Sequence, residues 1–171
     1  MEKQKKSKDW RAWRTHSSTV RAASGIPKNA KPWTTRPAVA LRGLPDSERV
    51  HDLLDTAFAM QQRINPAGST TEELVRGLMV DVSVAVQRKP WSTSPPTVTT
   101  RSMLYSFEKD TTLSGHAHMR LMGWPSDRSP AERFSDSDLR ALAGESYSVP
   151  LSALLNFTLF CNPWGTWWQP R

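Results

Sequence analysis

The sequence has very little cysteine and no long apolar run, and each absence excludes a class of protein. Cys161 is the single cysteine among 171 residues, which excludes an internal disulfide framework and a cysteine-based zinc site. No apolar run approaches the roughly 20 residues that span a bilayer. The first ten residues, MEKQKKSKDW, are basic with no apolar stretch behind them, which argues against a signal peptide. We therefore expect an intracellular protein, nuclear or otherwise, that is neither secreted nor membrane-bound.

Glycine is also scarce, and its positions exclude the common nucleotide-binding loops. None of the eight glycines belongs to a G-x-G-x-x-G array, a P-loop or a G-x-S-x-G elbow. His116 and His118 are two residues apart, which on a helix points them to opposite sides, so we expect packing or surface histidines and no metal site. Cys161 has no neighbouring base in the sequence, and we interpret it as a small buried hydrophobe. We identify no catalytic residue.

Positive charge is concentrated at one end of the chain. Residues 1–42 hold eleven Lys and Arg against two acidic residues, whereas residues 43–171 hold twelve against fourteen, which gives net charges of +9 and −2. Three prolines and one glycine interrupt the leading segment, and its apolar periodicity is weak. We therefore predict a basic, mostly disordered arm over residues 1–45. Such an arm either binds a polyanion (DNA, RNA or an acidic surface) or is a solvated tail.

The rest of the chain alternates between helical and strand periodicity. Apolar residues three and four apart predict a helix that Asp46 or Ser47 caps and that runs to about Ile64. Alternation with a period of two predicts a half-buried strand over 78–86, with Asp81 on its more polar side. A second strand is predicted over 97–107, followed by a turn at 108–110.

Capping residues mark further helices. Ser114 caps a short helix that ends at Gly123, and Ser135 with Asp138 has the form of a capping box that opens a helix closed by Gly144. The paired carboxylates Asp136 and Asp138 suit the first turn of that helix, so we assign them to capping rather than to catalysis.

A last helix, over 151–160, follows Pro150 and is apolar on most sides. Nine large apolar side chains lie between residues 150 and 168, more than a chain of this size can cover. We predict that this segment is an exposed docking surface for a missing partner. The alternative is that it folds back and packs against the helix over 46–64.

Three segments in order carry a resemblance to a known family. They are Pro96–Thr100 (PTVTT), Leu113–Pro125 (LSGHAHMRLMGWP) and Gly144–Pro150 (GESYSVP). Together they resemble the C-terminal third of the C5 cytosine-specific DNA methyltransferases. In that family a Pro-x-x-Thr-type strand leads into a helix of the form Leu-Thr-Pro-x-Glu-x-x-Arg-Leu-Gln-Gly-Phe-Pro, and a Gly-Asn-(Ala/Ser)-x-x-x-Pro block opens the last helix. The resemblance is clearer over 96–165 than over 46–95, and residues 166–171 form a tail.

The resemblance implies a mixed α/β fold with a few strands and three to four helices, built from target-recognition and small-domain elements. It places the strand residues Thr99, Thr100 and Arg101 in the target-recognition region. It also implies that Arg120 organises the small domain by donating hydrogen bonds to backbone carbonyls or DNA phosphates, which a guanidinium does through its fixed fork of donors.

The resemblance further implies a cofactor, S-adenosylmethionine, and two partners, DNA and a catalytic methyltransferase domain. Glu145, Ser146 and Tyr147 would form one wall of the cofactor pocket, with Glu145 standing where the family has Asn. The family's Pro-Cys nucleophile, Glu-Asn-Val segment and Phe-x-Gly-x-Gly turn do not occur in this sequence. We therefore predict that the chain transfers no methyl group by itself. The alternative is a non-enzymatic basic adaptor that binds nucleic acid or protein through its arm and its Trp-rich surface.

Overall fold

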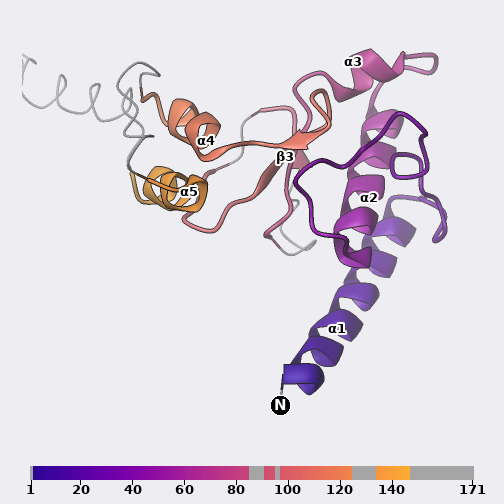
Figure 1. Cartoon of the computed structure of the whole chain (residues 1–171). Helices are drawn as coiled ribbons and strands as arrows, with labels where there is room; N and C mark the ends of the chain where they lie inside the picture. The colour runs from indigo at the N-terminus through magenta and orange to yellow at the C-terminus, as the bar shows by residue number, and fades with distance from the viewer. Residues whose placement is uncertain (1, 85–90, 95–96, 125–133, 147–171) are drawn as a thin grey trace, which may run out of the picture. The chain divides into compact units, whose positions relative to one another are not determined.

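The computed structural model describes residues 2–84, 91–94, 97–124 and 134–146, with the backbone alone for residues 2–12. The chain divides into two compact units, one made of residues 1–97 and 102–113 and the other of residues 98–101 and 114–171. The described residues form five helices and one four-stranded antiparallel sheet (Figure 1). The predicted mixed α/β class is confirmed.

The first unit contains the sheet and three helices. The four strands are ordered β2-β1-β3-β4, and every neighbouring pair is antiparallel. Val80 lies at the centre of the sheet, opposite Trp91 on one side and Tyr105 on the other. The elements are α1 (Glu2–Ala23), α2 (Glu48–Ile64), α3 (Thr71–Val75), β1 (Met79–Asp81), β2 (Trp91–Ser92), β3 (Leu104–Ser106) and β4 (Thr111–Thr112).

Helix α2 supplies much of the core of this unit, and its bounds agree with the predicted helix. Its apolar face is fully buried at Leu53, Leu54 and Phe58. The Trp33 ring packs 5.1 Å from the Phe58 ring and 4.8 Å from the Phe107 ring, centroid to centroid. Burying each such side chain contributes about 1.5–3 kcal/mol, so this aromatic cluster is a main source of stability.

The leading segment differs from the predicted disordered arm. Residues 2–23 form helix α1, and the segment after it places Trp33 in the core with 4% of its surface exposed. Ala40 and Leu41 are held as well, because their backbone N–H groups donate to the Asp110 carboxylate. The physical reason is that burial of Trp33 and these hydrogen bonds offset the entropy of ordering the segment, which its charge composition does not reveal.

The two predicted strands are shorter in the structure. The Asp81 carboxylate is buried, not on a polar face, and accepts from the Ser83 N–H (2.9 Å), the Ser102 hydroxyl (2.8 Å) and the Met103 N–H (3.2 Å). This turn ends β1 at Asp81, and residues 85–86 of the predicted strand lie outside the described residues. Of the predicted strand over 97–107, only Leu104–Ser106 pairs in the sheet, because residues 98–101 belong to the second unit.

The second unit contains α4 (Gly115–Leu121) and α5 (Asp136–Glu145), which pack against each other. Both predicted caps are confirmed: Ser114 accepts from the Ala117 N–H, and Ser135 with Asp138 forms a capping box. The helices approach closely at Gly115, where a Cβ atom would lie 2.5 Å from the Leu139 side chain. The predicted helix over 151–160, Cys161 and the predicted docking surface over 150–168 lie outside the described residues.

Candidate functional site

The segment 98–101 lies against helix α5 in the second unit, and a glycine makes this packing possible. A Cβ atom on Gly144 would lie 2.0 Å from the Thr100 backbone nitrogen and 2.1 Å from the Thr99 carbonyl carbon. Real Cβ atoms do not approach other atoms so closely, so only glycine fits here. Two of the three segments that carry the family resemblance therefore meet at this glycine.

The predicted DNA-contacting residues occupy exposed positions of the same unit. Thr99, Thr100 and Arg101 are exposed, with Thr100 and Arg101 in a turn, and Val98 beside them is buried. Arg120 is exposed near the end of α4. The two arginines are thus available to a ligand from solvent, as contacts with DNA phosphates require.

The predicted cofactor wall begins where α5 ends. Glu145 is the last residue of the helix and is exposed, whereas Ser146 is half-buried. Ser146 caps the helix: its N–H donates to the Leu142 carbonyl (2.9 Å) and its hydroxyl donates to the Ala143 carbonyl (3.0 Å). Tyr147 lies outside the described residues.

Gly144 does not end helix α5 as predicted, since the helix continues through Glu145. The glycine serves close packing rather than the left-handed backbone of a helix terminus.

The two histidines of α4 occupy different environments. His118 is fully buried, with its Nδ1 atom 2.9 Å from the Ser114 carbonyl oxygen, and His116 is half-buried. Over the residues that the structure describes, no three His, Cys, Asp or Glu side chains gather where they could hold a metal ion. His118 therefore contributes to the packing of α4.

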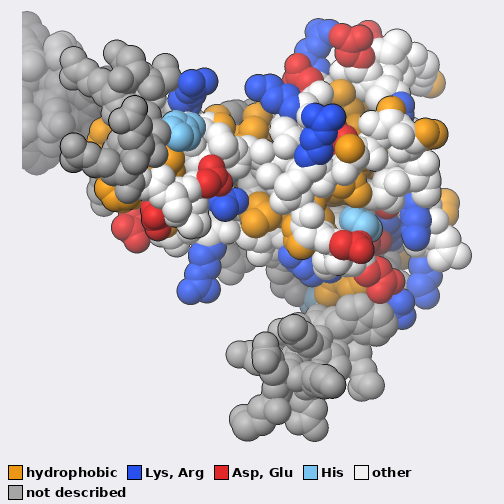
Figure 2. All heavy atoms as spheres, viewed as in Figure 1, with side chains coloured by type: hydrophobic (Ala, Val, Ile, Leu, Met, Phe, Trp, Pro, Cys, Tyr) orange, Lys and Arg blue, Asp and Glu red, His pale blue; other side chains and the backbone are white. Residues whose placement is uncertain are grey.

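The charge around this site is mixed. The exposed cations Arg101 and Arg120 share the unit with the acidic first turn of α5, where hydrogen bonds from Ser135 lower the pKa of Asp138 below its usual range. Basic and acidic side chains are interspersed on the face shown in Figure 2. Any binding of a polyanion must therefore come from local groups of cations.

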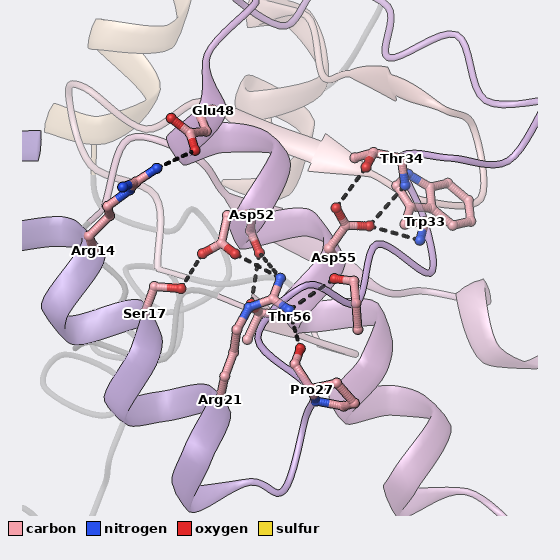
Figure 3. A network of polar contacts seen from close by, with 11 residues as sticks. Arg14, Ser17, Arg21, Pro27, Trp33, Thr34, Glu48, Asp52, Asp55 and Thr56 are labelled. Carbon is pink, nitrogen blue, oxygen red and sulfur yellow. Dashed lines mark hydrogen bonds and ion pairs between the residues drawn. The ribbon is translucent and has the colours of Figure 1, made fainter.

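A polar network in the first unit was not predicted from the sequence (Figure 3). Arg21, only 3% exposed, pairs with the Asp52 carboxylate at 2.7 Å and donates to the carbonyls of Pro27 (3.1 Å) and Ala30 (2.9 Å). The Ser17 hydroxyl donates to the same carboxylate. One buried guanidinium therefore joins α1, α2 and the 27–30 turn.

Asp55, one turn further along α2, holds the next part of the leading segment. Its carboxylate accepts from the backbone N–H groups of Trp33 (2.8 Å) and Thr34 (2.9 Å) and from the Thr34 hydroxyl (2.6 Å). The spacing of Trp13, Ser17 and Arg21, four residues apart on one helix face, is the signal in the sequence that could have predicted a packed helix.

A scan against protein-family models and a search of curated proteins found no match for the chain. Among the described residues, no helix is long and apolar enough to cross a membrane.

Proposed function

We propose that the chain is the target-recognition and small-domain portion of a C5 cytosine-specific DNA methyltransferase, and that it acts only together with a catalytic domain. In this role the second unit contacts DNA and closes one side of the S-adenosylmethionine pocket. The family resemblance of the three segments is the origin of the proposal.

The observation that favours it is the packing at Gly144. The segments PTVTT and GESYSVP are more than forty residues apart in the sequence, yet Thr99 and Thr100 lie against the glycine that begins the second one. Leu113–Pro125, the remaining segment, supplies α4, which packs on α5 in the same unit. A chance match of three short motifs gives no reason for residues of all three to lie in the second unit.

The residues at the end of α5 suit the edge of a polar cofactor. Glu145 offers an exposed carboxylate, which binds an ammonium group such as the one on the amino-acid part of S-adenosylmethionine. That cofactor supplies the methyl group when bound. The chain's own contribution would be to hold the cofactor's polar end and, through Arg101 and Arg120, the phosphates beside the target base.

Complementation tests this proposal directly. A C5 methyltransferase catalytic domain lacking its own small domain is mixed with the 171-residue chain, DNA and tritiated S-adenosylmethionine. We expect tritium transfer to DNA from the mixture and from neither component alone. Transfer by the chain alone, or no transfer from mixtures with several such catalytic domains, would contradict the proposal.

Gly144→Val sharpens the experiment, because its side chain must displace the backbone at Thr100. We expect this variant to lose complementation. The matched control is Leu142→Val, which places the same valine side chain at an exposed position on the opposite side of α5 from Gly144. If the two variants complemented equally well, the close packing of Gly144 against Thr100 would not be needed for function.

A non-enzymatic nucleic-acid adaptor is the second candidate, favoured by the sequence of α1. Helix α1 carries seven Lys and Arg against two acidic residues. An adaptor would bind DNA or RNA through this helix and would need no catalytic domain. Tight nucleic-acid binding without complementation would support the adaptor.

A further inference from the structure

A cleft of about 1110 Å³ opens in the first unit between α1, α2 and the turn after α1. Its walls include Trp13, Ser17 and Arg21 from α1, and Asp52 and Asp55 from α2. Its volume is slightly above the range for small-molecule sites, which is roughly 300–1,000 Å³. The network in Figure 3 lies along this cleft.

The carboxylates of the cleft are mostly occupied by groups of the protein itself. Asp52 is paired with Arg21, and Asp55 accepts three hydrogen bonds from Trp33 and Thr34. At the rim, Glu48 pairs with Arg14 at 3.1 Å. Asp46 is the fourth carboxylate, fully exposed, with the His51 ring 3.8 Å away. Arginines thus neutralise Asp52 and Glu48, whereas Asp55 is satisfied by neutral donors and Asp46 stays in contact with solvent.

Two lysines of the cleft belong to no ion pair among the described residues. They are Lys28 and Lys31, which line the cleft and are exposed. Asn29, whose amide can donate two hydrogen bonds, lies between them and also lines the cleft. Free positive charge is thus concentrated on this short turn.

Arg21 holds the backbone of this turn in place. Its guanidinium donates to the carbonyls of Pro27 and Ala30, which bracket Lys28 and Asn29, and Asp52 holds the guanidinium in place. The lysines therefore extend from a backbone that is already ordered, which lowers the entropy cost of binding an anion. Trp13 lies four residues before Ser17 and eight before Arg21 and offers an aromatic surface on the same helix.

We propose that this cleft binds a phosphate ester, with Lys28 and Lys31 neutralising the phosphate and Asn29 donating hydrogen bonds to its oxygens. The phosphate belongs either to a nucleic-acid backbone, which exposes its phosphates even in a duplex, or to a free nucleotide, whose base can stack on the Trp13 ring. The inference does not depend on the proposed methyltransferase role, because every residue of the cleft belongs to the first unit.

The test compares two double variants of the full chain that remove the same charge. Lys28→Gln with Lys31→Gln alters the cleft, and Arg76→Gln with Lys109→Gln alters exposed cations elsewhere in the first unit. Binding of a fluorescein-labelled 16-base-pair DNA duplex and of ADP is measured against salt concentration. We expect the cleft variant to bind about ten-fold more weakly at low salt. For the duplex, the slope of log affinity against log salt should fall by about 2, one for each lysine.

The pattern across the two probes identifies the ligand. Loss of duplex binding alone assigns the site to nucleic acid, loss of ADP binding alone assigns it to a free nucleotide, and loss of both shows a site that accepts either. The proposal is overturned if the cleft variant loses no more affinity than the control variant, or if the unaltered chain binds neither probe.

A second measurement needs no variant. Acetylation of surface lysines with an N-hydroxysuccinimide ester is followed by mass spectrometry in the presence and absence of the bound probe. We expect Lys28 and Lys31 to be protected several-fold and Lys109, outside the cleft, to react equally in both cases. The proposal would be contradicted if, in a sample shown to be saturated with the probe, Lys28 and Lys31 reacted as fast as they do without it.

Discussion

The Arg21 guanidinium lies 2.7 Å from the Asp52 carboxylate, and the two side chains are only 4% and 18% exposed. A buried ion pair adds little net stability, but removing one partner leaves an uncompensated charge. We predict that Asp52→Ala lowers the free energy of unfolding by about 3 kcal/mol, measured by urea denaturation.

Glu48→Ala provides the control for that variant. It removes a carboxylate of the same helix whose partner, Arg14, is exposed, and exposed pairs contribute less than about 1 kcal/mol. If the two variants lost equal stability, Asp52 would not be needed to compensate the buried charge of Arg21.

Tyr105 and Asp110 form a second link between the leading segment and the sheet. The Tyr105 hydroxyl donates to Asp110 at 2.5 Å and accepts from the Trp33 indole N–H at 3.1 Å. Tyr105→Phe removes both bonds and leaves the indole N–H buried without its acceptor. We predict a loss of about 1–3 kcal/mol in the free energy of unfolding. A change below about 0.5 kcal/mol would show that the link contributes nothing to stability.

The same tyrosine makes stability depend on pH in the alkaline range. Burial, together with the hydrogen bond to Asp110, raises the pKa of Tyr105 well above its usual value of 10. Above pH 10 the unfolded chain therefore releases this proton while the folded chain keeps it, so the free energy of unfolding falls as the pH rises.

Tyr105→Phe should flatten that dependence. It should also leave the tyrosinate absorbance change of the folded protein unaltered, because Tyr105 does not ionise before unfolding. A smaller absorbance change in the variant would show that Tyr105 ionises in the folded state.

The sequence predicted the helices and caps that are determined by residues close together in the chain. The apolar stripe of α2 and the caps at Ser114 and Ser135 are properties of a few adjacent positions, and all three are confirmed. Thr70 and Glu73 form a capping box of the same kind before α3, so that short helix could have been predicted by the same rule.

Interactions between distant residues could not be predicted in this way. The sequence shows Arg21 as one more cation in a basic run, and its partner Asp52 is 31 residues away. The sequence alone predicts that Gly144 ends a helix, since nothing beside it indicates that Thr99 and Thr100 pack there. The candidate sites depend on such pairings. The family resemblance named Arg101 and Arg120 for the second unit, whereas no sequence signal indicated the cleft of the first unit.

The capping box of α5 gives a prediction for the second unit. Hydrogen bonds from the Ser135 hydroxyl and N–H hold the pKa of Asp138 below its usual range. These two bonds are present at neutral pH and weaken as the pH falls and Asp138 takes up a proton, whereas the Asp138 N–H still donates to the Ser135 hydroxyl. Ser135→Ala should cost about 1 kcal/mol of helix stability. It should also raise the pKa of Asp138, measured by NMR of the carboxyl carbon. An unchanged pKa in this variant would contradict the assigned cause.

The start of helix α1 and the segment after the helix are expected to have different roles: the first binds nucleic acid and the second stabilises the fold. Residues 1–12 hold five of the seven Lys and Arg of α1, whereas Trp33 lies inside the core. Deleting residues 1–12 removes five Lys and Arg and two acidic residues. We predict that this deletion weakens DNA binding and reduces its salt dependence, while the free energy of unfolding changes by less than about 0.5 kcal/mol.

Trp33→Ala should instead lower the free energy of unfolding by about 3–5 kcal/mol while leaving the net charge unchanged. Anisotropy with labelled duplex DNA and urea denaturation measure the two properties on each variant. If the deletion left both the DNA affinity and its salt slope unchanged, the first twelve residues would have no part in binding nucleic acid.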